Sequence, residues 1–166
     1  MYDRILIPTD GSEGTVQAIE HALASADDGT TIHTLAVVDR RLYLSADKES
    51  QDAVLETLRE ESDRAVGMVV DRIEDAGYEA VGVVREGIPH AEIVSYADDL
   101  DVDLIVVGSH GRTGREKIVN FGSVTDRVIS NVGRPVMVVD IGPEDASQIE
   151  AAVGVDTDAP GESERV

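Results

Sequence analysis

The sequence predicts one open, doubly wound α/β domain built on a five-stranded parallel sheet. Two observations support this: short apolar runs alternate with amphipathic helical patterns up to residue 140, and the runs themselves are almost continuously apolar. Strands of that composition are buried on both faces, so helices must cover both sides of the sheet. Right-handed crossovers then give a doubly wound sandwich. The chain of 166 residues is long enough for one such domain.

The first strand and helix follow each other closely. Residues 4–8 (RILIP) are expected to form a buried strand. A helix then runs to about Ala26, with Asp10 or Ser12 as its N-cap, because both side chains accept hydrogen bonds from free N–H groups of a first turn. Residues 31–38 (TIHTLAVV) are the second strand.

Residues 39–49 are polar and are expected to form a loop. A long helix follows, because apolar residues recur at steps of three or four and form one stripe. That stripe contains Val54, Leu58, Ala65, Val69, Ile73 and Ala76. Gly77 ends the helix, as glycine commonly does at this position. Residues 79–85 are the third strand.

Pro89 suits the first turn of the next helix, where its missing N–H would have no partner in any case. Residues 103–107 (DLIVV) form the fourth strand, the most continuously apolar of the five. Gly122 or Ser123 begins the last helix, and residues 135–139 (PVMVV) are the fifth strand.

The charge balance is unusual, with 34 acidic residues against 14 basic ones and a net charge of −20. Self-repulsion of this kind destabilises a compact state in dilute salt and is screened at high ionic strength. We therefore favour the salt-rich cytosol of a halophilic archaeon, the alternative being an acidic protein with a basic partner. A nucleic-acid partner is not expected, because no basic stripe exists to neutralise phosphates.

The sequence also indicates where the protein works and where its domain ends. No apolar run is long enough to cross a membrane, the first strand leaves no room for a signal peptide, and cysteine is absent. A cytoplasmic protein is therefore expected. Residues 142–166 hold seven acidic residues and one arginine. We interpret them as a disordered acidic tail after a domain of residues 1–141.

Two glycine-containing loops mark a candidate site. Ligands of open α/β sheets bind beyond the carboxyl ends of the strands, where residues 8–12 (PTDGS) and 108–111 (GSHG) follow strands one and four. Both loops lead toward helix N-termini, which favour anions. Gly108, Gly111 and the pair at 122–123 predict phosphate contact, against the plainer interpretation that glycine only eases loop geometry.

The side chains of these loops leave several roles open. Asp10 is a candidate ligand of Mg²⁺ or a nucleotide, or only a helix cap. Arg112 and Arg115 are candidate phosphate partners, or they pair with surface carboxylates. His110 has no partner visible in the sequence that would make it a catalytic base, and the other three histidines are scattered and form no metal set.

These residues together resemble the universal stress protein family in its UspA-like form, over residues 2–140. The matching pieces are RILIPTDGS, LAVVD, EGIPHAEIV, VDLIVVGSHGRTG and GSVTDRVI followed by RPVMVV. The resemblance implies a Rossmann-like fold of the adenine nucleotide alpha hydrolase type, with strand order 3-2-1-4-5. It also implies a homodimer formed through the last strand, which would otherwise be an exposed apolar edge.

The resemblance implies an ATP site, possibly with Mg²⁺ at Asp10. The adenine and ribose would lie against Pro8, Thr9, Asp10 and Val37. The ribose and phosphates would be held by Gly108, Gly111, Gly122 and Ser123, with Arg112, Val124 and Thr125 nearby. ATP-binding members carry Gly-x-x-Gly, nine residues, then Gly-Ser/Thr, whereas ten residues separate the second and third glycines here.

We expect an ATP-binding stress-response protein with little or no fast catalysis, because no nucleophile–base pair is visible. The alternative is a nucleotide-free dimeric adaptor of the same fold, which the longer spacer favours. A nucleotide-cleaving enzyme is disfavoured, because PTDGS replaces the glycine-serine loop that such relatives carry after strand one.

Overall fold

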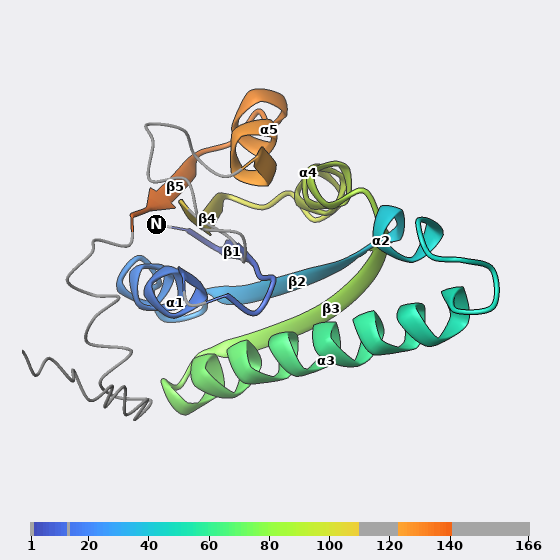
Figure 1. The fold of residues 1–166 in the computed structure, drawn as a ribbon. Coiled ribbons are helices and arrows are strands. Elements are labelled where there is room, and N and C mark those ends of the chain that lie inside the picture. Colours follow the sequence, from blue (N-terminus) through green and yellow to red (C-terminus); the bar gives the residue numbers. More distant parts are fainter. Residues whose placement is uncertain (1, 13, 110–122, 141–166) are drawn as a thin grey trace, which may run out of the picture.

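Five parallel strands form one sheet in the order β3-β2-β1-β4-β5 in the computed structural model, which describes residues 2–12, 14–109 and 123–140 (Figure 1). The strands are β1 (Arg4–Pro8), β2 (Thr31–Asp39), β3 (Glu79–Gly87), β4 (Leu104–Gly108) and β5 (Val136–Val139). The predicted fold class and strand order are therefore confirmed.

Helices cover both faces of the sheet (Figure 1). They are α1 (Gly14–Ala24), α2 (Arg40–Leu44), α3 (Gln51–Asp75), α4 (Pro89–Asp99) and α5 (Ser123–Asn131). Side chains of β1 alternate between two cores, because successive residues of a strand point to opposite faces. Ile5 and Ile7 pack with α1 and α3, whereas Leu6 packs with α4 and α5.

The sheet reverses its direction of growth between β1 and β4. The chain leaves β1 through α1 to pair β2 on one side, and it later returns through α4 to pair β4 on the other side. The residue after β1 is Thr9, and the last residue of β4 is Gly108. Ligands of doubly wound sheets bind at such a switch point, so the fold directs attention to these two strand ends.

The prediction of a loop over residues 39–49 was wrong in its first half, because α2 occupies Arg40–Leu44. Asp39 is the N-cap of this helix: its side chain accepts a hydrogen bond from the backbone N–H of Arg41 at 3.0 Å, which favours a helix start here. Helix α1 is described from Gly14, and because residue 13 lies outside the described residues the predicted cap at Asp10 or Ser12 stays a prediction.

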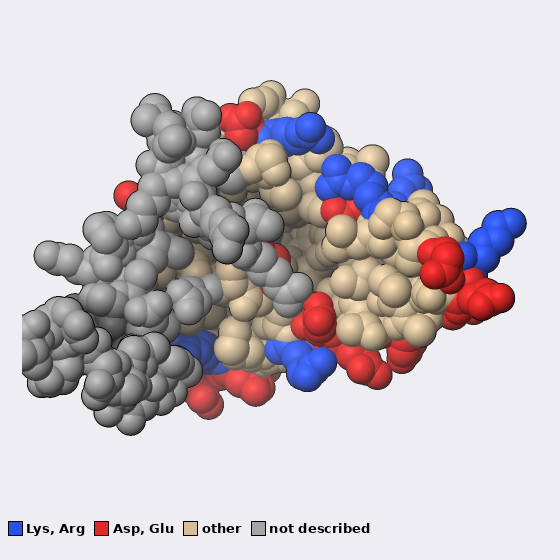
Figure 2. Space-filling view, viewed as in Figure 1, with Lys and Arg blue, Asp and Glu red and all other residues tan. Residues whose placement is uncertain are grey.

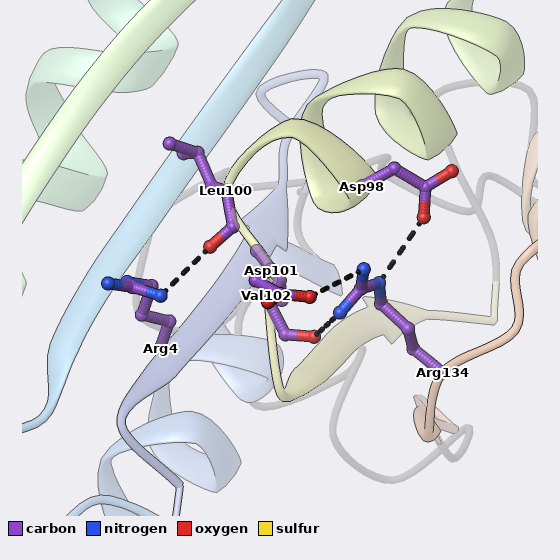
Figure 3. Close-up of polar contacts among 6 residues, drawn as sticks. All are labelled: Arg4, Asp98, Leu100, Asp101, Val102 and Arg134. Carbon is purple, nitrogen blue, oxygen red and sulfur yellow. Dashed lines mark hydrogen bonds and ion pairs between the residues drawn. The ribbon is translucent and has the colours of Figure 1, made fainter.

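Two arginines hold the turn between α4 and β4, at the end of the sheet opposite the switch point (Figure 3). Arg134 donates to the Val102 carbonyl at 2.8 Å and to carboxylate oxygens of Asp101 and Asp98 at 3.1 and 3.3 Å. Arg4 donates to the Leu100 carbonyl at 3.1 Å. These contacts fix a turn in which Asp101 has a φ of 54°. We interpret them as structural.

No helix among the described residues is long and apolar enough to span a membrane. Residues 141–166 lie outside the described part of the chain. The domain boundary at residue 141 and the disordered acidic tail therefore remain predictions.

Candidate functional site

A cleft of about 340 Å³ lies beyond the carboxyl ends of β1, β2 and β4. This volume is in the lower part of the range of roughly 300–1,000 Å³ that is typical of small-molecule sites. Figure 2 shows the molecule hollowed on this face, with acidic side chains gathered over α3 below the hollow. The first turns of α1, α4 and α5 contribute to its walls.

Most of the predicted site residues meet at this cleft. Those that line it are Pro8, Thr9, Asp10, Val37, Gly108, Ser123, Val124 and Thr125. Gly111, Arg112 and Gly122 lie outside the described residues, as do His110 and Arg115. Residues from four separate stretches of the sequence are thus brought to one place, as the position of the strand ends requires.

The turn after β1 is held by two threonine hydroxyls. Thr9 Oγ1 lies 3.0 Å from Thr15 Oγ1 and accepts a hydrogen bond from the Gly11 N–H at 3.1 Å. Both threonines are buried. Gly11 has a φ of 78°, which favours glycine. The Thr9 hydroxyl therefore shapes the cleft wall rather than facing outward as an uncommitted group.

Asp10 forms a local turn after β1. Its Oδ1 accepts a hydrogen bond from the Ser12 N–H at 2.9 Å, in a turn of the kind that aspartate favours. Helix α1 is described from Gly14, and residue 13 lies outside the described residues. The capping interpretation of Asp10 therefore stays open, and its carboxylate lies at the exposed rim of the cleft.

The end of β4 lies very close to the start of α1 and α5. A Cβ atom added to Gly108 would lie 3.4 Å from the Cα and the carbonyl oxygen of Gly14. Thr125 donates its hydroxyl to the Gly108 carbonyl at 3.2 Å, which ties the first turn of α5 to this strand end. Ser123, the first residue of α5, therefore brings a helix N-terminus to the cleft.

The end of β2 contributes residues that the sequence did not single out. Asp39 lines the cleft and binds the Arg41 guanidinium through both oxygens, at 2.9 and 2.6 Å. The Arg41 guanidinium lowers the pKa of the Asp39 carboxyl. Leu42 of α2 also lines the cleft, although it is 54% exposed.

One stripe of α3 faces the cleft at its N-terminal half. Leu58, Glu61, Ser62 and Ala65 all line it, at the spacing that places residues on one side of a helix. Farther along, the same helix packs Val69 and Ile73 into the core. The sequence contains a signal for this change from cleft to core, because the apolar residues of the α3 stripe skip from position 58 to position 65.

The described lining is acidic. It contains the carboxylates of Asp10, Asp39 and Glu61, and among the described lining residues there is no lysine, arginine or histidine. The charge of Asp39 is balanced by Arg41, which is not itself a lining residue. A polyanion bound here therefore needs cations from elsewhere. Within the described ranges no three His, Cys, Asp or Glu side chains are grouped as a metal site.

Comparison with known proteins gives a consistent result. The model of the universal stress protein family matches residues 1–140. Universal stress protein MJ0531 of Methanocaldococcus jannaschii is 38% identical over 141 residues, which cover 84% of this chain and 82% of that protein. The solved structure of MJ0577 is 35% identical, with a TM-score of 0.79, and the match covers 86% of this chain and 99% of that one.

More distant structures share the fold. One universal stress protein was solved in complex with cAMP and is 23% identical with a TM-score of 0.53, covering 84% of this chain and 97% of that one. Another, from Archaeoglobus fulgidus, was solved in complex with dAMP and is 22% identical with a TM-score of 0.57, covering 82% and 97%.

Proposed function

The chain belongs to the universal stress protein family, and we propose that it binds ATP in the cleft at the switch point as a signalling input rather than as a substrate for fast chemistry. The observation that carries this proposal is the convergence of three strand ends and a helix N-terminus on one cleft. The two distant relatives solved with cAMP and dAMP support an adenine nucleotide as the ligand class.

The order of the strand ends suggests how the nucleotide lies. Neighbouring strands are about 4.8 Å apart, so the ends of β2 and β4 are separated by about 10 Å with β1 between them. Val37 of β2 and Leu42 of α2, which directly follows β2, line the cleft with apolar side chains, as does Leu58 of α3. In this proposal the adenine lies over β2, the ribose over Pro8–Asp10, and the phosphates toward β4 and α5.

The phosphates would be held mainly by backbone groups. Ser123 starts a nine-residue helix, whose first N–H groups and dipole favour an anion. Gly108 lets the backbone approach closely because it carries no side chain. In this proposal Gly111, Gly122 and Arg112 complete the phosphate contacts, while Val124 and Thr125 form the wall beside them.

Mg²⁺ fits the charge of the site. The described lining carries carboxylates and no cationic side chain, so a bound triphosphate would face repulsion without a counter-ion. Asp10, at the rim, can supply one carboxylate oxygen, and the phosphates and water would supply the other ligands, as Mg²⁺ usually requires. We expect chelation of Mg²⁺ to weaken ATP binding at least tenfold in wild type and to have a smaller effect in Asp10→Asn.

Little or no fast hydrolysis is part of this proposal. The Ser and Thr hydroxyls that line the cleft have no histidine or lysine beside them among the lining residues that the structure describes, and the Thr9 hydroxyl is hydrogen-bonded to that of Thr15. Activation of a hydroxyl nucleophile normally needs an adjacent base. In this proposal the ligand acts by being bound.

Mass spectrometry of small molecules released from the purified protein tests this function. We expect an adenine nucleotide at up to one per chain, either carried through purification or retained after loading with millimolar Mg-ATP and rapid gel filtration. Release of no nucleotide in either case would remove the proposal.

The second candidate is a nucleotide-free dimeric adaptor. The ten-residue spacer between Gly111 and Gly122 favours it, because one extra residue can move the N–H groups of Gly122 and Ser123 away from a phosphate. In either case we propose a homodimer through β5, which among the described strands pairs only with β4. Light scattering should then give about twice the chain mass of 17.7 kDa.

A further inference from the structure

We propose that Leu42 of α2 covers one face of the adenine, and that this short helix thereby sets how tightly the cleft holds the base rather than the phosphates. The inference rests on the proposed function and extends it to an element outside the motifs of the sequence. Leu42 follows β2, at the end of the cleft away from Gly108 and Ser123.

The exposure of Leu42 is the first observation. It is 54% exposed although it lines the cleft, and α2 has no buried residue. A leucine in this position loses contact with water when a flat apolar group enters the cleft, and such burial is favourable. Val37 and Leu58 also line the cleft. These three apolar side chains have the chemistry that a purine ring requires.

The attachment of α2 is the second observation. Asp39, the last residue of β2, caps the helix through the Arg41 N–H and also binds the Arg41 guanidinium. These contacts hold the first turn of α2 in its helical form. The backbone that carries Leu42 is therefore ordered before the base arrives, which lowers the cost of binding.

The same helix provides a matched control. Leu44 is 57% exposed, close to the value for Leu42, but it is not among the residues that line the cleft. Leu42→Ala and Leu44→Ala remove the same atoms from the same helix. Any effect on helix propensity or solubility should therefore be shared by the two variants. An effect on the affinity for the adenine base should appear only in Leu42→Ala.

The experiment is titration calorimetry of wild type, Leu42→Ala, Leu44→Ala and Leu42→Met with Mg-ATP and with AMP. Leu42→Ala should raise the Kd of both ligands about eightfold, equivalent to about 1.2 kcal/mol at 1.4 kcal/mol per factor of ten. Leu44→Ala should stay within a factor of two of wild type. Leu42→Met keeps an apolar side chain of similar volume and should bind nearly as wild type does.

The outcomes separate this inference from the proposed function. If wild type binds ATP but Leu42→Ala and Leu44→Ala bind it equally well, the role of Leu42 is wrong and the nucleotide site stands. A loss for ATP that exceeds the loss for AMP would place Leu42 near the phosphates and would also overturn the inference. If wild type binds neither ligand, the proposed function fails and this inference fails with it.

Discussion

Replacing Gly108 by alanine tests whether the end of β4 lies against a ligand. The added methyl would lie 3.4 Å from the Cα and carbonyl oxygen of Gly14, at the short limit of ordinary van der Waals contact. Gly108 does not have a positive φ, so alanine fits the backbone. We therefore expect the free energy of unfolding to change by less than about 1 kcal/mol.

The effect on ligand affinity should be larger. Both Gly108 and Gly14 line the cleft, so a methyl added between them reduces the space in the cleft where the phosphates are proposed to approach the backbone. If the methyl displaces a phosphate from one backbone N–H group, one hydrogen bond to a charged group is lost. Such a bond is worth about 1.5–3 kcal/mol, which corresponds to roughly a 10- to 150-fold increase in the Kd of Mg-ATP.

The matched control is Gly67→Ala. Its added methyl would have no neighbour within 4 Å, and the residue lies inside α3 and does not line the cleft. Alanine should stabilise the helix by up to about 1 kcal/mol and leave affinity unchanged. Both variants are compared by thermal unfolding and titration calorimetry. A folded Gly108→Ala protein that binds Mg-ATP as wild type does would refute the placement of the phosphates.

Three further predictions concern stability. With a net charge of −20, the free energy of unfolding should rise as KCl is raised from 0.1 to 3 M, because salt screens self-repulsion; an unchanged denaturation midpoint would contradict the interpretation of a high-salt protein. Gly82→Ala should cost about 1–3 kcal/mol, since its methyl would clash with Val66 and lie 2.9 Å from Val70 Cγ2, and denaturant titration should show the loss. Burial lowers the pKa of His33, so the unfolded chain binds the proton more readily and stability should fall as the pH drops below about 6.5. His33→Gln should have a shallower pH dependence of the unfolding free energy between pH 7 and 5, and equal slopes would show that His33 does not contribute.

The fold could be predicted because each strand is marked by its own residues. The run at 104–107 is apolar at every position and is buried on both sides. By contrast, β3 continues to Gly87, two residues beyond the predicted end, because it pairs with β2 up to Asp39. The composition of β3 alone does not show that pairing. The helix α2 was missed because a cap at Asp39, rather than apolar periodicity, defines its start.

The candidate site could be predicted where it depends on topology. Parallel strands of a doubly wound sheet end at one edge, so the residues after β1 and β4 had to meet. The contribution of Leu42, Glu61 and Ser62 depends on how α2 and α3 lie over that edge, which a sequence pattern does not give. The break in the apolar stripe at positions 61 and 62 was the available signal.

Titration calorimetry of the wild-type protein with Mg-ATP in molar KCl tests the central claim most directly. We expect saturable binding of one nucleotide per chain with a Kd well below millimolar, and weaker binding when Mg²⁺ is chelated. Absence of binding up to millimolar Mg-ATP, from a protein shown to be folded in the same buffer, would contradict the claim and favour the nucleotide-free adaptor.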